Sequence, residues 1–229
     1  MPGTGELNQH QLTEADTCRL FVTPKLVEAG WDQPPHGIAE QRTFTDGRIY
    51  IVGREARRKE QKRADYLLRY TRDFTLAVVE AKPEGEIVGT GMQQAKEYAE
   101  MLGLKFAYAT NGHTILEFDF LTGIEQEISA YPTPQELWAR LRTGSSLADE
   151  QAAKTFLTPL NHTTGKSPRY YQEIAINRVL MAILSGQKRV LLTMAILQCA
   201  CWKERQFLIL QWGGASWRAV GALRRLRHA

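Results

Sequence analysis

Residues 64–82 read ADYLLRYTRDFTLAVVEAK, and this stretch decides the fold class. Residues 65–70 and 76–81 are two short, mostly apolar runs of the kind found in buried strands. The polar residues Thr71, Arg72 and Asp73 separate them, which favours a tight turn. We therefore predict a β-hairpin.

Helical and strand patterns alternate on both sides of this hairpin. Thr13 has the features of a helix N-cap, and apolar residues then recur at spacings of three and four as far as Gly30. A loop containing Pro34 and Pro35 follows. The predicted elements, in chain order, are a helix over 14–29, strands over 47–53, 65–70 and 76–81, a helix over 92–102, and strands over 105–110 and 115–120. This order predicts a mixed α/β fold in which helices flank a central sheet.

Composition bounds the class of protein. The chain has 229 residues, of which 43% are hydrophobic and 24% charged, as expected for a globular protein. Its three cysteines, Cys18, Cys199 and Cys201, are too few for a disulfide scaffold and lack the partners of a zinc site. The sequence has neither a long uncharged apolar run nor a secretory signal at its start, so we expect a cytoplasmic protein without a membrane span.

The predicted hairpin carries a group of chemically active residues. It brings Asp65, near the start of one strand, close to Glu80, near the end of the other. Glu80 and Lys82 are two residues apart and therefore point to the same face. Two carboxylates suit Mg²⁺, and a neighbouring lysine can hold an attacking water or a phosphoryl oxygen. A Glu-x-Lys triplet alone is more often an ordinary strand edge, but the aspartate at hairpin distance favours a site.

The helix after the hairpin adds a polar pair. Gln94 and Tyr98 are four residues apart and share one helix face. Such a pair is usually a solvated surface feature. Its position directly after Glu80 and Lys82 favours a role in supporting the same site.

Basic residues are concentrated in one short segment. The formal net charge of the chain is +4. Six basic residues crowd into positions 54–63: Arg54, Arg57, Arg58, Lys59, Lys62 and Arg63. This cluster is either a solvated loop or a contact to DNA phosphates.

Together these residues resemble a known nuclease family. Asp65, Glu80-Ala81-Lys82 and Gln94-x-x-x-Tyr98 resemble the PD-(D/E)xK motifs followed by the QxxxY motif. Their combination is similar to the N-terminal domain of the restriction subunit of type I restriction–modification enzymes. The likeness covers roughly residues 10–195, and Ala64 stands where the motif's name has proline. Further matching segments are 14–17 (EADT), 27–31 (VEAGW), 47–49 (GRI), 94–100, 109–112 (ATNG) and 132–138 (PTPQELW).

The resemblance implies a role for each of these residues. Asp65 and Glu80 would ligate Mg²⁺, Lys82 would position the water that attacks the phosphate, and Gln94 and Tyr98 would support the site. Glu14 would add a helix-borne carboxylate, although in a first helical turn it also complements the helix dipole. The implied activity is cleavage of double-stranded DNA in a complex with modification and specificity subunits. The alternative is a catalytically silent module for DNA binding or assembly.

The resemblance also indicates how the chain is divided. Residues 1–143 would form the PD-(D/E)xK nuclease domain, 144–168 a linker, and 169–195 the start of a superfamily 2 helicase motor. Arg169 and Gln172 resemble the adenine-recognising residues of such motors. No G-x-x-x-x-G-K-[ST] loop occurs in the sequence. The helicase-like segment is therefore predicted to be incomplete, and ATP, which the family uses, is not expected to bind productively.

Residues 196–229 match no element of the family. They contain three of the five tryptophans and a single acidic residue, Glu204. We interpret them as a basic tail left by an interrupted reading frame. The competing interpretation is a basic amphipathic helix that contacts nucleic acid or a membrane surface.

Overall fold

The computed structural model describes residues 13–44, 49–52, 55–58, 61–145, 147, 149–159, 169–197, 203–213 and 216–223. The chain divides into two units. The first comprises Met1–Gly144 and Pro159–Gly165, and the second comprises Ser145–Thr158 and Lys166–Ala229. Each unit is described by itself.

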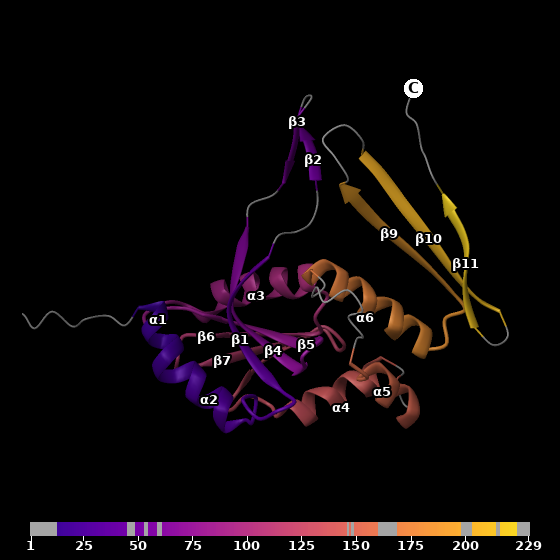
Figure 1. The fold of residues 1–229 in the computed structure, drawn as a ribbon. Coiled ribbons are helices and arrows are strands. Elements are labelled where there is room, and N and C mark those ends of the chain that lie inside the picture. The colour runs from indigo at the N-terminus through magenta and orange to yellow at the C-terminus, as the bar shows by residue number, and fades with distance from the viewer. Residues whose placement is uncertain are drawn as a thin grey trace, which may run out of the picture. The chain divides into compact units, whose positions relative to one another are not determined.

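A six-stranded mixed sheet forms the centre of the first unit (Figure 1). Its strand order is β1-β4-β5-β6-β7-β8. The strands β5 and β6 run parallel, whereas the other neighbouring pairs of this sheet are antiparallel. The strands are β1 (Gly37–Phe44), β4 (Lys62–Thr71), β5 (Phe74–Ala81), β6 (Phe106–Thr110), β7 (Ile115–Asp119) and β8 (Ile124–Ile128).

The predicted hairpin is confirmed as β4 and β5, whose register pairs Tyr66 with Val79 and Leu68 with Ala77. All residues of β5 from Leu76 to Ala81 are buried, and so is every residue of β6. Strands in the middle of a sheet that is covered on both faces carry such continuous apolar runs. This explains why the sequence of β5 shows no alternation.

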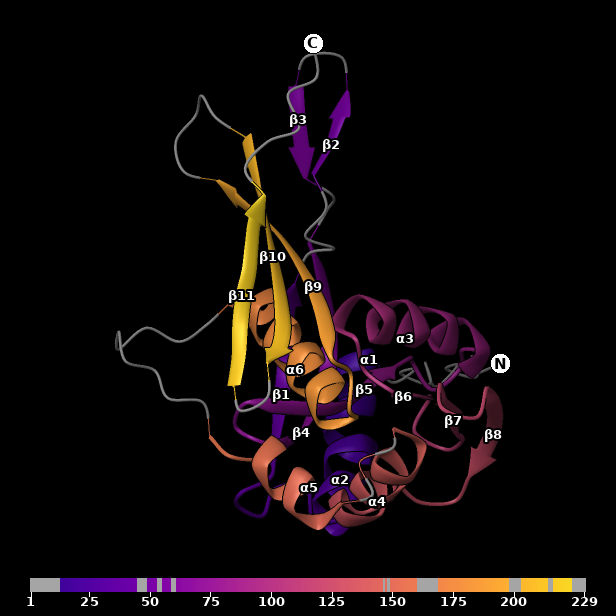
Figure 2. The ribbon, with the colours of Figure 1, turned by 90° about the vertical axis from the view of Figure 1, so that its right-hand side faces the viewer.

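Helices cover both faces of the sheet (Figures 1 and 2). The helix α3 (Val88–Leu102) connects the parallel strands β5 and β6 and lies on one face. It buries its apolar side, which includes Met92, Ala95 and Ala99, and ends at Gly103, whose φ of 71° is readily adopted by glycine. The helices α2 (Thr23–Glu28) and α4 (Pro134–Gly144) lie on the other face. A capping box begins α4, because Thr133 Oγ1 accepts from the Glu136 N–H and Glu136 Oε2 accepts from the Thr133 N–H.

The first predicted helix contains a π-helical turn. It consists of α1 (Glu14–Thr17), the π-helix η1 (Cys18–Val22) and α2, with the predicted N-cap at Thr13. The N–H of Thr23 reaches back five residues to the carbonyl of Cys18. Pro24 follows directly and has no N–H to donate, so the wider turn lies where the regular bonding pattern is interrupted.

Several strands lie where the sequence did not predict them. The edge strand β1 follows Pro34 and Pro35, in the predicted loop, and β8 is an exposed edge strand whose three central residues are polar. The strand predicted over 47–53 is described as β2 (Ile49–Val52). It pairs with β3 (Glu55–Arg58), so this part of the basic cluster is a strand and not a loop. Arg54 and Lys59 lie outside the described residues.

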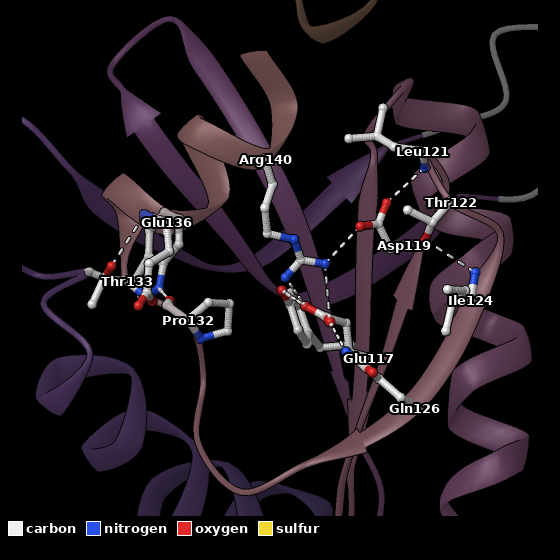
Figure 3. A network of polar contacts seen from close by, with 12 residues as sticks. Glu117, Asp119, Leu121, Thr122, Ile124, Gln126, Pro132, Thr133, Glu136 and Arg140 are labelled. Atoms are coloured by element: carbon white, nitrogen blue, oxygen red, sulfur yellow. Dashed lines mark hydrogen bonds and ion pairs between the residues drawn. The ribbon is translucent and has the colours of Figure 1, made fainter. Parts of the chain in front are cut away.

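A polar network fastens α4 to the sheet (Figure 3). The guanidinium of Arg140 forms a bidentate ion pair with Glu117 of β7, with N–O distances of 2.8 and 3.1 Å. It also donates to Asp119 Oδ2 at 2.7 Å. Tyr108 and Gln126 donate further hydrogen bonds to the Glu117 carboxylate. Burial works to raise the pKa of Glu117, but the hydrogen bonds from Arg140 and the two other donors outweigh it, so that the pKa is lowered.

The second unit consists of two helices and a three-stranded sheet. The helix α5 (Glu150–Phe156) lies within the predicted linker of residues 144–168. The segment that resembles the start of a helicase motor, residues 169–195, contains the helix α6 (Tyr170–Leu184). The strand β9 (Arg189–Leu197) pairs with β10 (Lys203–Gly213), which pairs with β11 (Ser216–Leu223). The competing interpretation of residues 196–229 as an amphipathic helix is therefore wrong, because the described part of that tail forms antiparallel strands. In the described part of the chain, no helix has the length and apolarity needed to cross a membrane.

Candidate functional site

The sheet brings the two predicted carboxylates together. Because the register pairs Tyr66 with Val79, Asp65 lies across from Glu80 on the neighbouring strand. Residues directly opposite in an antiparallel pair have Cβ atoms about 5 Å apart and share one face. Both side chains are buried, with 3% and 2% of their residue surface exposed. Asp65 and Glu80 therefore form a buried acidic pair on the face covered by α3.

Gln94 connects the remaining predicted residues. Its Oε1 accepts a hydrogen bond from Lys82 Nζ at 2.8 Å. Its Nε2 donates to Glu80 Oε1 and to Tyr98 Oη, the latter at 2.9 Å. One side chain of α3 thus bonds to the carboxylate, the ammonium and the phenol, so the structure brings together Glu80, Lys82, Gln94 and Tyr98.

Close packing of α3 against the strands limits the room for Lys82. At Gly91 a Cβ atom would lie only 3.1 Å from Lys82 Cγ and 3.4 Å from Lys82 Cε. A glycine at this position lets the lysine stem pass beside the helix. The stem therefore runs toward Gln94 through space that a larger residue would narrow.

The carboxylate of Asp65 is held from two sides. Oδ2 accepts a hydrogen bond from the backbone N–H of Ala81 at 2.8 Å, and Oδ1 accepts one from Gln41 Nε2 at 3.1 Å. Sequence reasoning missed both donors. Gln41 lies on β1, which was predicted as a loop, and no sequence motif marks the Ala81 N–H.

Burial and mutual repulsion disfavour the ionised form of this acidic pair. Burial raises the pKa of Glu80 to about 8, and the nearby negative charge of Asp65 adds to the effect, while Lys82 opposes it. Glu80 Oε2 is buried and has no hydrogen-bond partner among the described residues. A divalent cation would satisfy this oxygen and offset the repulsion between the carboxylates, so these residues fit Mg²⁺.

Glu14 lies near this pair but does not complete a cluster of three ligands. Burial raises its pKa, and the charge of Asp65 contributes next, which places Glu14 within the electrostatic reach of the site. Among the described side chains, however, no group of three or more histidine, cysteine, aspartate or glutamate residues is arranged to hold a metal ion. A site based on Asp65 and Glu80 would take its other ligands from water and phosphate oxygens.

The predicted adenine-side residues belong to the second unit. Arg169 is the N-cap of α6, and its backbone N–H donates to Gln172 Oε1 at 2.9 Å. The Gln172 side chain therefore caps the helix in this structure. Their role in adenine recognition stays a prediction.

Comparison with known proteins identifies the family. No family model matches the chain. The endonuclease subunit of the type I restriction enzyme EcoAI from Escherichia coli is 37% identical over 196 residues, which are 83% of this chain and 24% of that protein. A solved fragment structure described as that of an HsdR subunit of a type I restriction enzyme, from Vibrio vulnificus YJ016, is 59% identical. It has a TM-score of 0.72 and covers 82% of this chain and 35% of that one.

The chain thus spans about a quarter of the length of the curated relative that it matches. The match includes most of the chain, and the structural likeness extends over the mixed sheet and its helices. The chain is therefore homologous to a part of HsdR, the restriction subunit of type I restriction enzymes.

Proposed function

We propose that the first unit is a PD-(D/E)xK nuclease domain that cleaves phosphodiester bonds of double-stranded DNA with Mg²⁺. The observation that carries this proposal is the unpartnered, buried Glu80 Oε2 beside Asp65, in a site whose lysine is held by Gln94. Asp65 and Glu80 would hold the ion. When bound, Mg²⁺ stabilises the negative charge that develops on the scissile phosphate.

The side chains of the site have distinct tasks in this proposal. One N–H of the Lys82 ammonium is engaged by Gln94 Oε1, which leaves two to hold the attacking water or a phosphoryl oxygen. The water oxygen would form a bond to phosphorus as the bond to the leaving oxygen breaks. Gln94 fixes Lys82 and Glu80 relative to each other, and Tyr98 Oη accepts the second N–H of the Gln94 amide.

The family relationship supplies the setting of this reaction. We propose that the domain acts within a complex of restriction, modification and specificity subunits, in which the specificity subunit determines the DNA sequence recognised. The basic cluster of residues 54–63 would contribute contacts to DNA phosphates. Such contacts act on every DNA sequence alike, as expected for a subunit that does not itself read the bases.

A plasmid-nicking assay with Mg²⁺, with and without the partner subunits, tests the activity. Lys82→Ala should lower the cleavage rate at least about a hundredfold, the usual size of a lost acid–base or charge-stabilising group. The matched control is Lys96→Ala on α3, which removes an ion pair to Glu125 outside the site. It should cleave like the wild type, and circular dichroism should show both variants folded.

Two results would contradict the nuclease proposal. One is equal cleavage by the Lys82→Ala variant and the wild type. The other is the absence of cleavage by the wild type in every combination of subunits, together with intact DNA binding. The second result would favour a module for DNA binding or assembly.

A further inference from the structure

Asp65 has a neighbour on its other side that no motif includes. The β1–β4 register pairs Glu40 with Tyr66 and Arg42 with Ala64, which places Gln41 across from Asp65. Gln41, Asp65 and Glu80 therefore lie in one row across three neighbouring strands. The Gln41 amide donates to Asp65 Oδ1 at 3.1 Å.

The backbone of Gln41 is strained. Its φ is 49°, and it is the only non-glycine residue in the described part of the chain with a positive φ. This left-handed conformation is unfavourable for residues with a Cβ, and glutamine is not among the types that tolerate it best. Gln41 is exposed, so burial of its side chain does not compensate for the strain. Strain of this kind in a non-glycine residue tends to occur at functional sites.

We infer that Gln41 is a positioning residue, which orients the Asp65 carboxylate for a divalent cation. This inference rests on the proposed function. The Ala81 N–H and the Gln41 amide each occupy one position on one carboxylate oxygen, so each oxygen keeps a further lone pair for a ligand. Because the amide is neutral, it holds the carboxylate without cancelling the negative charge that attracts the ion.

The competing explanation is that Gln41 only fills a gap in the β1–β4 ladder. The two explanations differ in what a substitution changes. A purely structural contact affects the stability of the fold and leaves the affinity for Mg²⁺ intact. A positioning contact affects the affinity, because a ligand that must be ordered on binding holds the ion less well.

Two substitutions separate backbone strain from hydrogen bonding. Gln41→Gly removes the amide and relieves the strain, so its melting temperature without metal should equal or exceed that of the wild type. Gln41→Met removes the amide but keeps a side chain of similar length and the strained φ. Thr43→Gly on the same strand is the matched control. It should lower the melting temperature and leave the affinity for Mg²⁺ unchanged.

The measurement is calorimetric titration of the full chain with Mg²⁺, together with thermal unfolding in EDTA. We expect both Gln41 variants to bind Mg²⁺ about tenfold more weakly than the wild type, as for other residues that orient metal ligands. If both stay within twofold of the wild type while Asp65→Asn abolishes binding, the role of Gln41 is overturned and the metal site stands. If the wild type takes up no Mg²⁺, or Asp65→Asn binds it equally well, the proposed function and this inference are both overturned.

Discussion

The protonation of Glu80 connects the site to the stability of the fold. Without a metal ion, burial and the charge of Asp65 raise the pKa of Glu80 to about 8 from an ordinary value of 4.5. An acid whose pKa is raised on folding binds its proton more tightly in the folded state. The free energy of unfolding therefore falls as the pH rises from about 4.5 toward 8.

Glu80→Gln should remove this pH dependence. In EDTA at pH 8–9 the variant should be more stable than the wild type by on the order of a few kcal/mol, since each unit of pKa shift corresponds to about 1.4 kcal/mol. At pH 4.5 the two proteins should be nearly equal, because the wild-type carboxyl is then protonated in the fold. Urea unfolding at several pH values measures the difference.

Mg²⁺ provides the control for this experiment. It should stabilise the wild type at pH 8 and leave Glu80→Gln almost unaffected, because a ligand stabilises only the state that binds it. A difference between the two proteins that does not change with pH would contradict the proposed protonation of Glu80.

At the scale of elements, one ion-pair network fastens α4 to β7. Arg140→Met should lower the free energy of unfolding by about 3 kcal/mol, because it leaves the charge of Glu117 buried without its partner. We choose the lower end of the known range because the Arg140 side chain is 34% exposed. Since the pKa of Glu117 is lowered in the fold, this contribution should be present above about pH 4.5 and be lost as the pH falls below it.

Denaturant unfolding of Arg19→Met is the matched control. Arg19 pairs with Asp16 across 3.7 Å at the surface, and such pairs contribute little to stability. Equal losses in the two variants would mean that burial does not distinguish the Arg140 network from an ordinary surface ion pair.

Among these elements, the sequence predicts the central hairpin but not the edge strand beside it. The spacing of Asp65 and Glu80 about a polar turn predicted both the hairpin and the closeness of the two side chains, since a turn of known length determines the register of its strands. The strand β1 was not predicted, because an edge strand with a single buried residue has no apolar alternation. The two donors to Asp65 depend on that edge strand and on a main-chain N–H, and neither leaves a pattern in side-chain types.

At the scale of the whole chain, the absence of a phosphate-binding loop from the sequence predicts that ATP will not bind measurably. Backbone N–H groups of such a loop and its lysine provide the main contacts to the phosphates. Beyond residue 195, where the resemblance to the family ends, β9 continues to Leu197 and pairs with β10. Calorimetric titration with ATP and Mg²⁺ should therefore show no binding at micromolar concentrations, and no phosphate should be released.

A titration with adenosine in parallel isolates any adenine contact made by Arg169 and Gln172. Micromolar affinity for ATP that is lost in Gln172→Ala would contradict the prediction. It would also require the Gln172 amide to leave the helix cap that it forms in this structure.

The bond from the Ala81 N–H to Asp65 has an evolutionary consequence. Mutations at position 81 change the side chain and leave this donor in place, with proline as the exception. This hydrogen bond to Asp65 is therefore insensitive to sequence drift, provided that the new side chain fits the buried space around residue 81. The hydrogen bond from Gln41 comes from a side chain, so a single codon change can remove it. Among diverging relatives, the hydrogen bond from position 41 to Asp65 should therefore be lost before the one from position 81.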